Sequence, residues 1–173
     1  MIVVRYVILL ILVLVALVDD YKRYKISNRI IVSGLLVACV MCAAEMCMLY
    51  VVNKNNADIM YGGYRGYKET GLMYMSGMVL AFVIGYVLYM VKAIGAGDVK
   101  LFGVAGMLIG SKDVVYLIGV SLAAGVFTGI IEILRKKETV LVTGRSMHKF
   151  HFSYAIMQGV CIVVCLKLTG IVS

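Results

Sequence analysis

Three aspartates stand where a carboxylate could take part in chemistry. Asp19 and Asp20 end the first apolar run, and Asp98 begins a later one within the sequence Gly-Ala-Gly-Asp-Val-Lys at 95–100. Two carboxylates brought side by side do not readily ionise together, so one acts as an acid and the other as a base. Such a pair can activate a water molecule to attack a peptide carbonyl and then protonate the leaving amine. The positions of these aspartates alone are equally consistent with catalytic carboxylates and with solvated side chains at helix ends.

Two glycines beside Asp98 favour the catalytic interpretation. Gly95 and Gly97 allow backbone conformations that other residues avoid, and they let another segment approach closely. Adjacent helical residues point about 100° apart, so only one of Asp19 and Asp20 is expected to face Asp98.

The elements that hold these residues are predicted to be membrane helices. The chain is 63% hydrophobic with a mean hydropathy of +1.01, and a bilayer span needs about 20 mostly apolar residues. Apolar runs occupy 2–18, 28–52, 72–91, 98–110, 114–134 and 152–172. The sequence therefore predicts an all-α fold, a polytopic transmembrane helical bundle of about six spans, with residues 1–173 forming one integral-membrane domain.

Local signals refine these helices. Ser27 or Asn28 can cap the second helix by accepting a backbone N–H. In the third, Gly77, Ala81 and Gly85 recur every four residues, which lines small residues on one face and lets another helix approach closely in lipid. A similar pair, Gly125 and Gly129, lies in the fifth run.

Basic residues set the expected orientation. The net charge is +8, but Lys and Arg lie between the apolar runs, so we expect a topology signal and no nucleic-acid partner. Eleven of them fall in or beside the first, third and fifth loops and six on the other side. The sequence predicts a multi-pass protein of the cytoplasmic (inner) membrane, with Asp20 and Asp98 on the cytoplasmic side and both termini outside.

No metal or cofactor is expected. Cys39 and Cys42 have zinc-like spacing, but no second pair of ligands lies near them in the sequence. All five cysteines, Cys39, Cys42, Cys47, Cys161 and Cys165, lie within apolar runs and are interpreted as small buried hydrophobes.

Other polar residues are open to two interpretations. Lys100 is about 200° from Asp98 on a helix, which favours a structural contact or an extension to lipid head groups over direct chemistry. His148 and His151 lie in the basic fifth loop, where solvation is expected and a substrate-binding or pH-sensing role stays open. Glu45 and Glu132 are expected to be paired or to extend outward.

The motifs resemble those of the type IV prepilin peptidase family. Asp20, five residues and then Ile26-Ser27-Asn28 resemble that family's Asp, five residues, Ile-Pro-Asn, with Ser27 in place of Pro. The segment 95–100 resembles its Gly-x-Gly-Asp-x-Lys motif. Residues 152–156 followed by Gly159 resemble its last-span signature without the prolines.

The resemblance implies a membrane aspartyl protease with Asp20 and Asp98 as the catalytic pair. It also implies supporting roles for five further motif residues: Gly95, Gly97, Lys100, Ile26 and Asn28. The implied substrate is a prepilin or pilin-like precursor with a basic leader and a hydrophobic helix, cut at the cytoplasmic face of the bilayer without a cofactor.

The chain resembles the small, peptidase-only members, including those of tight-adherence pili and the preflagellin-peptidase type. Members that also methylate the new pilin N-terminus typically carry a larger first loop with two Cys-x-x-Cys pairs. Here that loop is short and has no cysteine, so methyltransferase activity is not expected.

Two alternatives belong to other classes. Presenilin-type and signal-peptide-peptidase-type proteases share Gly-x-Gly-Asp, but they carry a Pro-Ala-Leu motif, and this chain has no proline. A small cation- or proton-coupled transporter or a helical scaffold could use Asp20 and Asp98 to bind ions, but no convincing internal repeat is visible.

The topology is testable by cysteine labelling in intact cells. With the native cysteines replaced, a single cysteine at Lys25 should react with an impermeant reagent only after permeabilisation, and one at Arg65 should react from outside. Labelling of position 25 in intact cells would contradict the predicted orientation.

Overall fold

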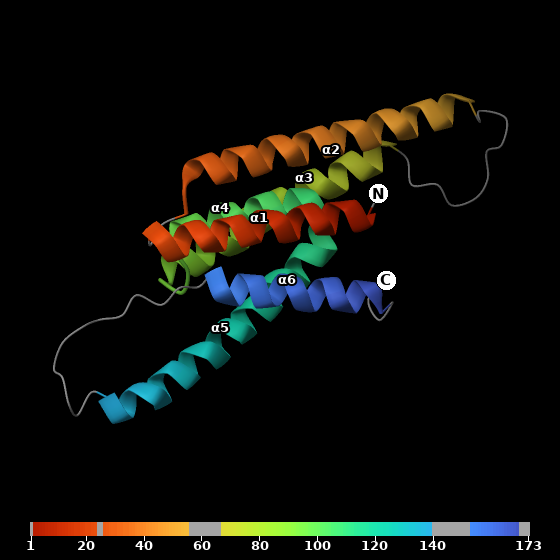
Figure 1. Ribbon diagram of the computed structural model, residues 1–173. Coiled ribbons are helices and arrows are strands. Elements are labelled where there is room, and N and C mark those ends of the chain that lie inside the picture. The colour runs from red at the N-terminus through yellow and green to blue at the C-terminus, as the bar shows by residue number, and fades with distance from the viewer. Residues whose placement is uncertain (1, 24–25, 56–66, 140–152, 170–173) are drawn as a thin grey trace.

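The computed structural model describes residues 2–23, 26–55, 67–139 and 153–169 (Figure 1). These residues form six helices, which follow one another along the chain. Their bounds are α1 Ile2–Arg23, α2 Asn28–Asn55, α3 Tyr67–Met90, α4 Ala96–Ile109, α5 Ser111–Thr139 and α6 Ser153–Leu168. The predicted all-α class is confirmed, and each predicted apolar run corresponds to one helix.

The helices differ in whether they are long and apolar enough to cross a bilayer. In the described part of the chain, three segments are long and apolar enough to cross a membrane: Asn28–Val51, Thr70–Met90 and Ser111–Ile131. Helices α4 and α6 have 14 and 16 residues, which at about 1.5 Å per residue is shorter than the roughly 30 Å apolar core of a bilayer. The chain is a membrane protein whose short helices are held by longer ones.

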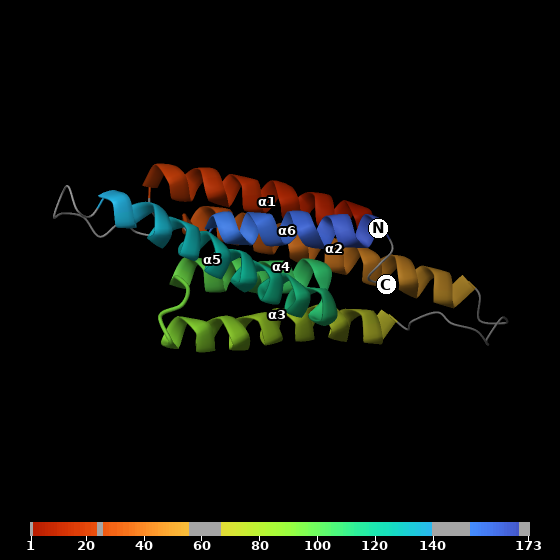
Figure 2. The ribbon, with the colours of Figure 1, turned by 90° about the horizontal axis from the view of Figure 1, so that it is seen from below.

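Helix α4 occupies the centre of the bundle. Eleven of its 14 residues are buried, and it contacts α1, α2, α3 and α5. Figure 2 shows α4 between α3 and α1, while α5 crosses the bundle and extends beyond it. The short helix is therefore positioned by its neighbours on several sides.

The small-residue face of α3 is the surface against which α4 packs. A Cβ at Gly77 would lie 2.5 Å from the carbonyl oxygen of Gly106 in α4, and a Cβ at Gly106 would collide with the Gly77 backbone. Further along the same face, Gly85 lies against Val99. The predicted close approach is thus confirmed, with α4 as its partner. In contrast, a Cβ added at Gly129 in α5 would meet no atom of another described segment within 4 Å.

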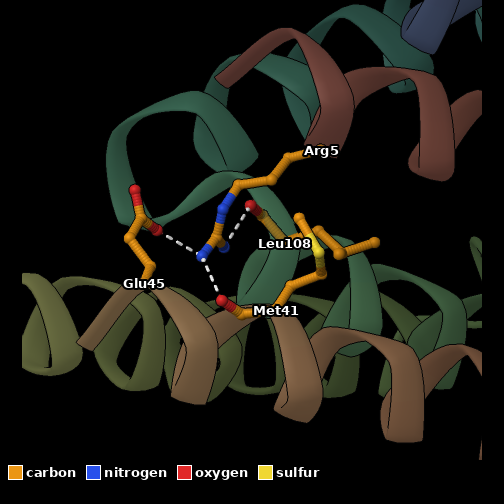
Figure 3. Close-up of polar contacts among 4 residues, drawn as sticks. All are labelled: Arg5, Met41, Glu45 and Leu108. Atoms are coloured by element: carbon orange, nitrogen blue, oxygen red, sulfur yellow. Dashed lines mark hydrogen bonds and ion pairs between the residues drawn. The ribbon is translucent and has the colours of Figure 1, made fainter. Parts of the chain in front are cut away.

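A buried arginine joins four helices at the end of α1 away from Asp20 (Figure 3). Arg5 is 2% exposed. Its Nη1 donates to the carbonyl oxygen of Leu108 at 3.1 Å, and its Nη2 donates to that of Met41 at 3.3 Å and pairs with Glu45. The guanidinium also lies 3.9 Å from the centre of the Tyr74 ring. The predicted pairing of Glu45 is confirmed, and the pair offsets the cost of a charge inside the bundle.

A second polar cluster ties α1 to α5 and α6 at the same end. The Tyr6 hydroxyl donates to Oδ2 of Asp113 at 2.5 Å, and Lys167 Nζ lies 3.3 Å from the same oxygen. Together with Arg5, this cluster fixes the positions of α1 and α6 along the axis of the bundle.

Gly77→Ala should destabilise the protein because the added methyl group forces α3 and α4 apart. Overpacking of this kind typically costs about 1–3 kcal/mol, which should lower the temperature of thermal unfolding in detergent micelles. Gly129→Ala is the matched control: it adds the same methyl group in open space, where alanine favours the helix by about 1 kcal/mol. Equal losses in the two variants would contradict the close-packed α3–α4 contact.

Candidate active site

Asp20 and Asp98 come together where α1 contacts α4. Asp20 lies near the end of α1 and is half-buried, whereas Asp98 lies in the first turn of α4 and is 8% exposed. Helices α1 and α4 pack against each other, and the charge of Asp20 acts on the Asp98 carboxyl group. The end of α1 and the starts of α4 and α6 lie on one side of the bundle (Figure 1). The two residues that the motifs single out thus stand at the same end of two helices that contact each other.

Gly95 shapes the start of α4 through close approach. Its φ of −80° and ψ of 155° are open to any residue, so the expectation that its backbone conformation requires glycine is wrong. Its N–H donates to Oδ2 of Asp98 at 3.2 Å, and a Cβ at Gly95 would also lie 3.2 Å from that oxygen. The absence of a side chain lets the Asp98 carboxylate fold back over the helix start, where the backbone N–H fixes its direction.

The remaining motif residues connect the α1–α2 turn to α4. A Cβ at Gly97 would lie 3.3 Å from Cβ of Ile26, which is buried. Lys100 Nζ donates to Oδ1 of Asn28 at 3.1 Å. Of the two interpretations of Lys100, the structure thus supports the structural contact. Both contacts hold the segment after Asp20 against the helix that carries Asp98.

Asp19 faces the turn into α2. Its Oδ2 accepts a hydrogen bond from the backbone N–H of Ser27 at 2.8 Å. The Ser27 hydroxyl accepts the N–H of Arg29 at 3.4 Å, so Ser27 caps α2 as predicted. The sequence also allows Asp19 to pair with Arg23 four residues on, but the side chain of Arg23 lies outside the described residues.

Two effects of opposite sign act on the Asp98 carboxyl group. Burial disfavours a charged carboxylate, whereas the Gly95 N–H and the N-terminus of α4 favour one. A neighbouring carboxylate, here Asp20, adds a penalty for carrying both charges at once. Burial and the neighbouring carboxylate thus oppose the Gly95 N–H and the helix terminus in their effect on the charge of Asp98.

Ser153 is a site residue that the sequence interpretation did not single out. It is the first residue of α6 and is 3% exposed, and its hydroxyl donates to Oδ2 of Asp20 at 2.6 Å. The only signal in the sequence was its place in the segment at 152–156 that resembles a last-span signature. The site therefore draws one side chain from each of three helix ends.

An open groove between α1 and α2 lies beside the site. Its lining is mostly apolar and comprises Leu14, Val15, Val18, Asp19, Lys22 and Ile30.

The remaining candidates from the sequence are two histidines, one glutamate and the cysteines. His148, His151 and the side chain of Glu132 lie outside the described residues. Within the described ranges, no group of three or more His, Cys, Asp or Glu side chains could hold a metal ion. All five cysteines are free, but only Cys42 is buried, so the expectation that all five are buried is wrong.

Comparison with known proteins gives one match. A family model described as the type IV leader peptidase family matches residues 7–131, which is more than half of the chain and includes Asp20 and Asp98. No curated protein and no solved structure matches the chain.

Lys100→Met should cost about 1 kcal/mol of stability, because it removes an exposed hydrogen bond to Asn28 while keeping the apolar stem. Asn28→Ala should have a similar effect, and the double variant should lose little more than either single one, since both remove the same bond. Thermal unfolding in micelles measures all three. Strict additivity would show that the two side chains act independently.

Proposed function

Because the chain belongs to the type IV leader peptidase family, we propose that it is a membrane-embedded aspartic endopeptidase. Its substrates are type IV prepilins or pilin-like precursors, and it removes their basic leader. Cleavage takes place at the cytoplasmic face of the inner membrane, where the predicted topology puts Asp20 and Asp98. The family match favours this function over the transporter, the scaffold and the presenilin-type alternatives.

The observation that carries the proposal is the meeting of two carboxylates at helix ends. Asp98 is buried and oriented by the Gly95 N–H, and Asp20 acts on it electrostatically. Buried charges without partners are costly, and pairs of interacting carboxylates are a recurrent means of peptide hydrolysis. In this scheme Lys100 does not react: it donates a hydrogen bond to Asn28 and so helps to position α4 against the start of α2.

The reaction proceeds by general acid and base catalysis. The ionised member of the pair takes a proton from water as the water oxygen attacks the scissile carbonyl carbon. The protonated member stabilises the developing oxyanion by hydrogen bonding, and a proton then passes to the leaving nitrogen as the C–N bond breaks. The pair returns to its starting state after each turnover, because the proton taken from water leaves with the new amine.

The proposed activity needs neither a metal nor a methyl donor. Only residues 24–27 separate α1 from α2, which leaves no room there for the cysteine-bearing loop of the bifunctional family members. The enzyme is therefore proposed to be a peptidase only.

Asp20→Asn and Asp98→Asn should each reduce cleavage at least about a thousandfold, because asparagine keeps the size and hydrogen bonding of aspartate but cannot exchange a proton. The double variant should be no less active than either single one, since the two residues act as a unit. The assay follows cleavage of a purified prepilin by the full-length protein in detergent, with EDTA present and S-adenosylmethionine absent.

Asp19→Asn is the matched control in the same assay. Its side-chain oxygen can still accept the Ser27 N–H, so the variant should keep more than about a third of the activity, an estimate that rests on preserving this hydrogen bond. An inactive Asp19→Asn beside an active Asp20→Asn would move the catalytic role to Asp19. Activity restored to an EDTA-treated enzyme only by zinc would contradict the metal-free pair.

A further inference from the structure

The hydroxyl of Ser153 forms a short contact with the proposed catalytic pair, and nothing in the family match assigns it a role. The match ends at residue 131, whereas Ser153 opens α6. We propose that Ser153 is a positioning residue, which holds the Asp20 carboxylate in its reactive orientation through the bond from Oγ to Oδ2. The inference rests on the proposed peptidase function and deepens it by bringing α6 into the site.

The contact is built into the packing of α6. Ser153 is 3% exposed, and Ala155 and Ile156 in the same turn are 0% and 1% exposed. Because α6 packs against both α1 and α5, its first turn has little freedom to move. A donor fixed this firmly can restrict the rotamers of the Asp20 side chain.

Three other helical hydroxyls in the described chain donate within their own helices. Ser33, Ser76 and Thr128 donate to carbonyl oxygens three or four residues earlier in the same helix. Ser153 has no preceding helical turn, because it is the first residue of α6. Its proton goes instead to a carboxylate 133 residues away in the sequence. The hydrogen bond therefore joins α6 to the proposed site and is not part of the internal hydrogen bonding of α6.

The hydrogen bond fixes the position of one oxygen of Asp20, because Oδ2 accepts the Ser153 hydroxyl. Catalytic groups generally need neighbours that hold them in orientation and do not themselves react. Ser153 is thus expected to affect the rate of the chemical step and to leave substrate binding nearly unchanged.

The test compares three variants in the prepilin cleavage assay. Ser153→Ala removes the donor, Ser153→Cys fills the same space with a weak donor, and Ser153→Thr restores a hydroxyl. Ala and Cys should each lower kcat at least about tenfold with KM within about twofold, since a hydrogen bond to a charged group is lost. Thr should return kcat to within about threefold of the unmodified protein.

Ser121→Ala is the control for loss of a buried serine. Ser121 is 0% exposed on α5 and its hydroxyl has no hydrogen-bond partner within the described residues, so this variant should keep its kcat. Protein yield and thermal unfolding are measured in parallel, and if Ser153→Ala does not fold, Ser153→Cys decides.

Three results would overturn the inference: a kcat within twofold of normal in the Ala or Cys variant, an effect on KM alone, or a stable Thr variant as slow as Ala. Each leaves the proposed function intact. Failure of the unmodified protein to cleave any prepilin would instead contradict the proposed function itself.

Discussion

The backbones of α3 and α4 touch because Gly77 and Gly106 face each other across the contact. In lipid there is little hydrophobic force to drive helices together, so close packing between small residues has to supply much of the attraction. This contact draws a short helix into the centre of the bundle, where α1, α2 and α5 enclose it. Asp98 lies in the first turn of that helix, so its burial depends on α4 being held inside the bundle.

The second requirement is that each helix has the correct axial register relative to the helices it packs against. A slip of one residue moves a helical side chain by about 1.5 Å along the axis and 100° around it, which is enough to replace Asp20 by Asp19. Arg5 fixes α1 against α2 and α4, and the Asp113 cluster fixes α1 against α5 and α6. These polar anchors lie at the far end of α1, so they set the register without entering the site.

The sequence predicts the helices, the small face of α3 and a cap at Ser27 or Asn28, because each depends on residues that are close neighbours in one helix. For Glu45 it predicts a paired or outward-extending side chain and does not name the partner. Contacts such as Ser153 with Asp20, and Lys100 with Asn28, depend on how separate helices are aligned, and no local pattern carries that information. The Gly95 case is instructive: glycine is needed there for space beside Asp98, while its φ and ψ are ordinary.

Helix ends are a physically favourable place for this chemistry in a membrane protein. A charged side chain at the centre of a bilayer costs about 2.5–3.5 kcal/mol on insertion scales, and Arg5, which is buried, needs Glu45 and two carbonyl oxygens to be tolerated. A carboxylate at a helix end lies nearer water, which the reaction consumes, and unpaired backbone N–H groups are available there to orient it. Asp20, Asp98 and Ser153 come from three such ends, so the geometry of the site is a property of how whole helices pack and cannot be held by any single loop.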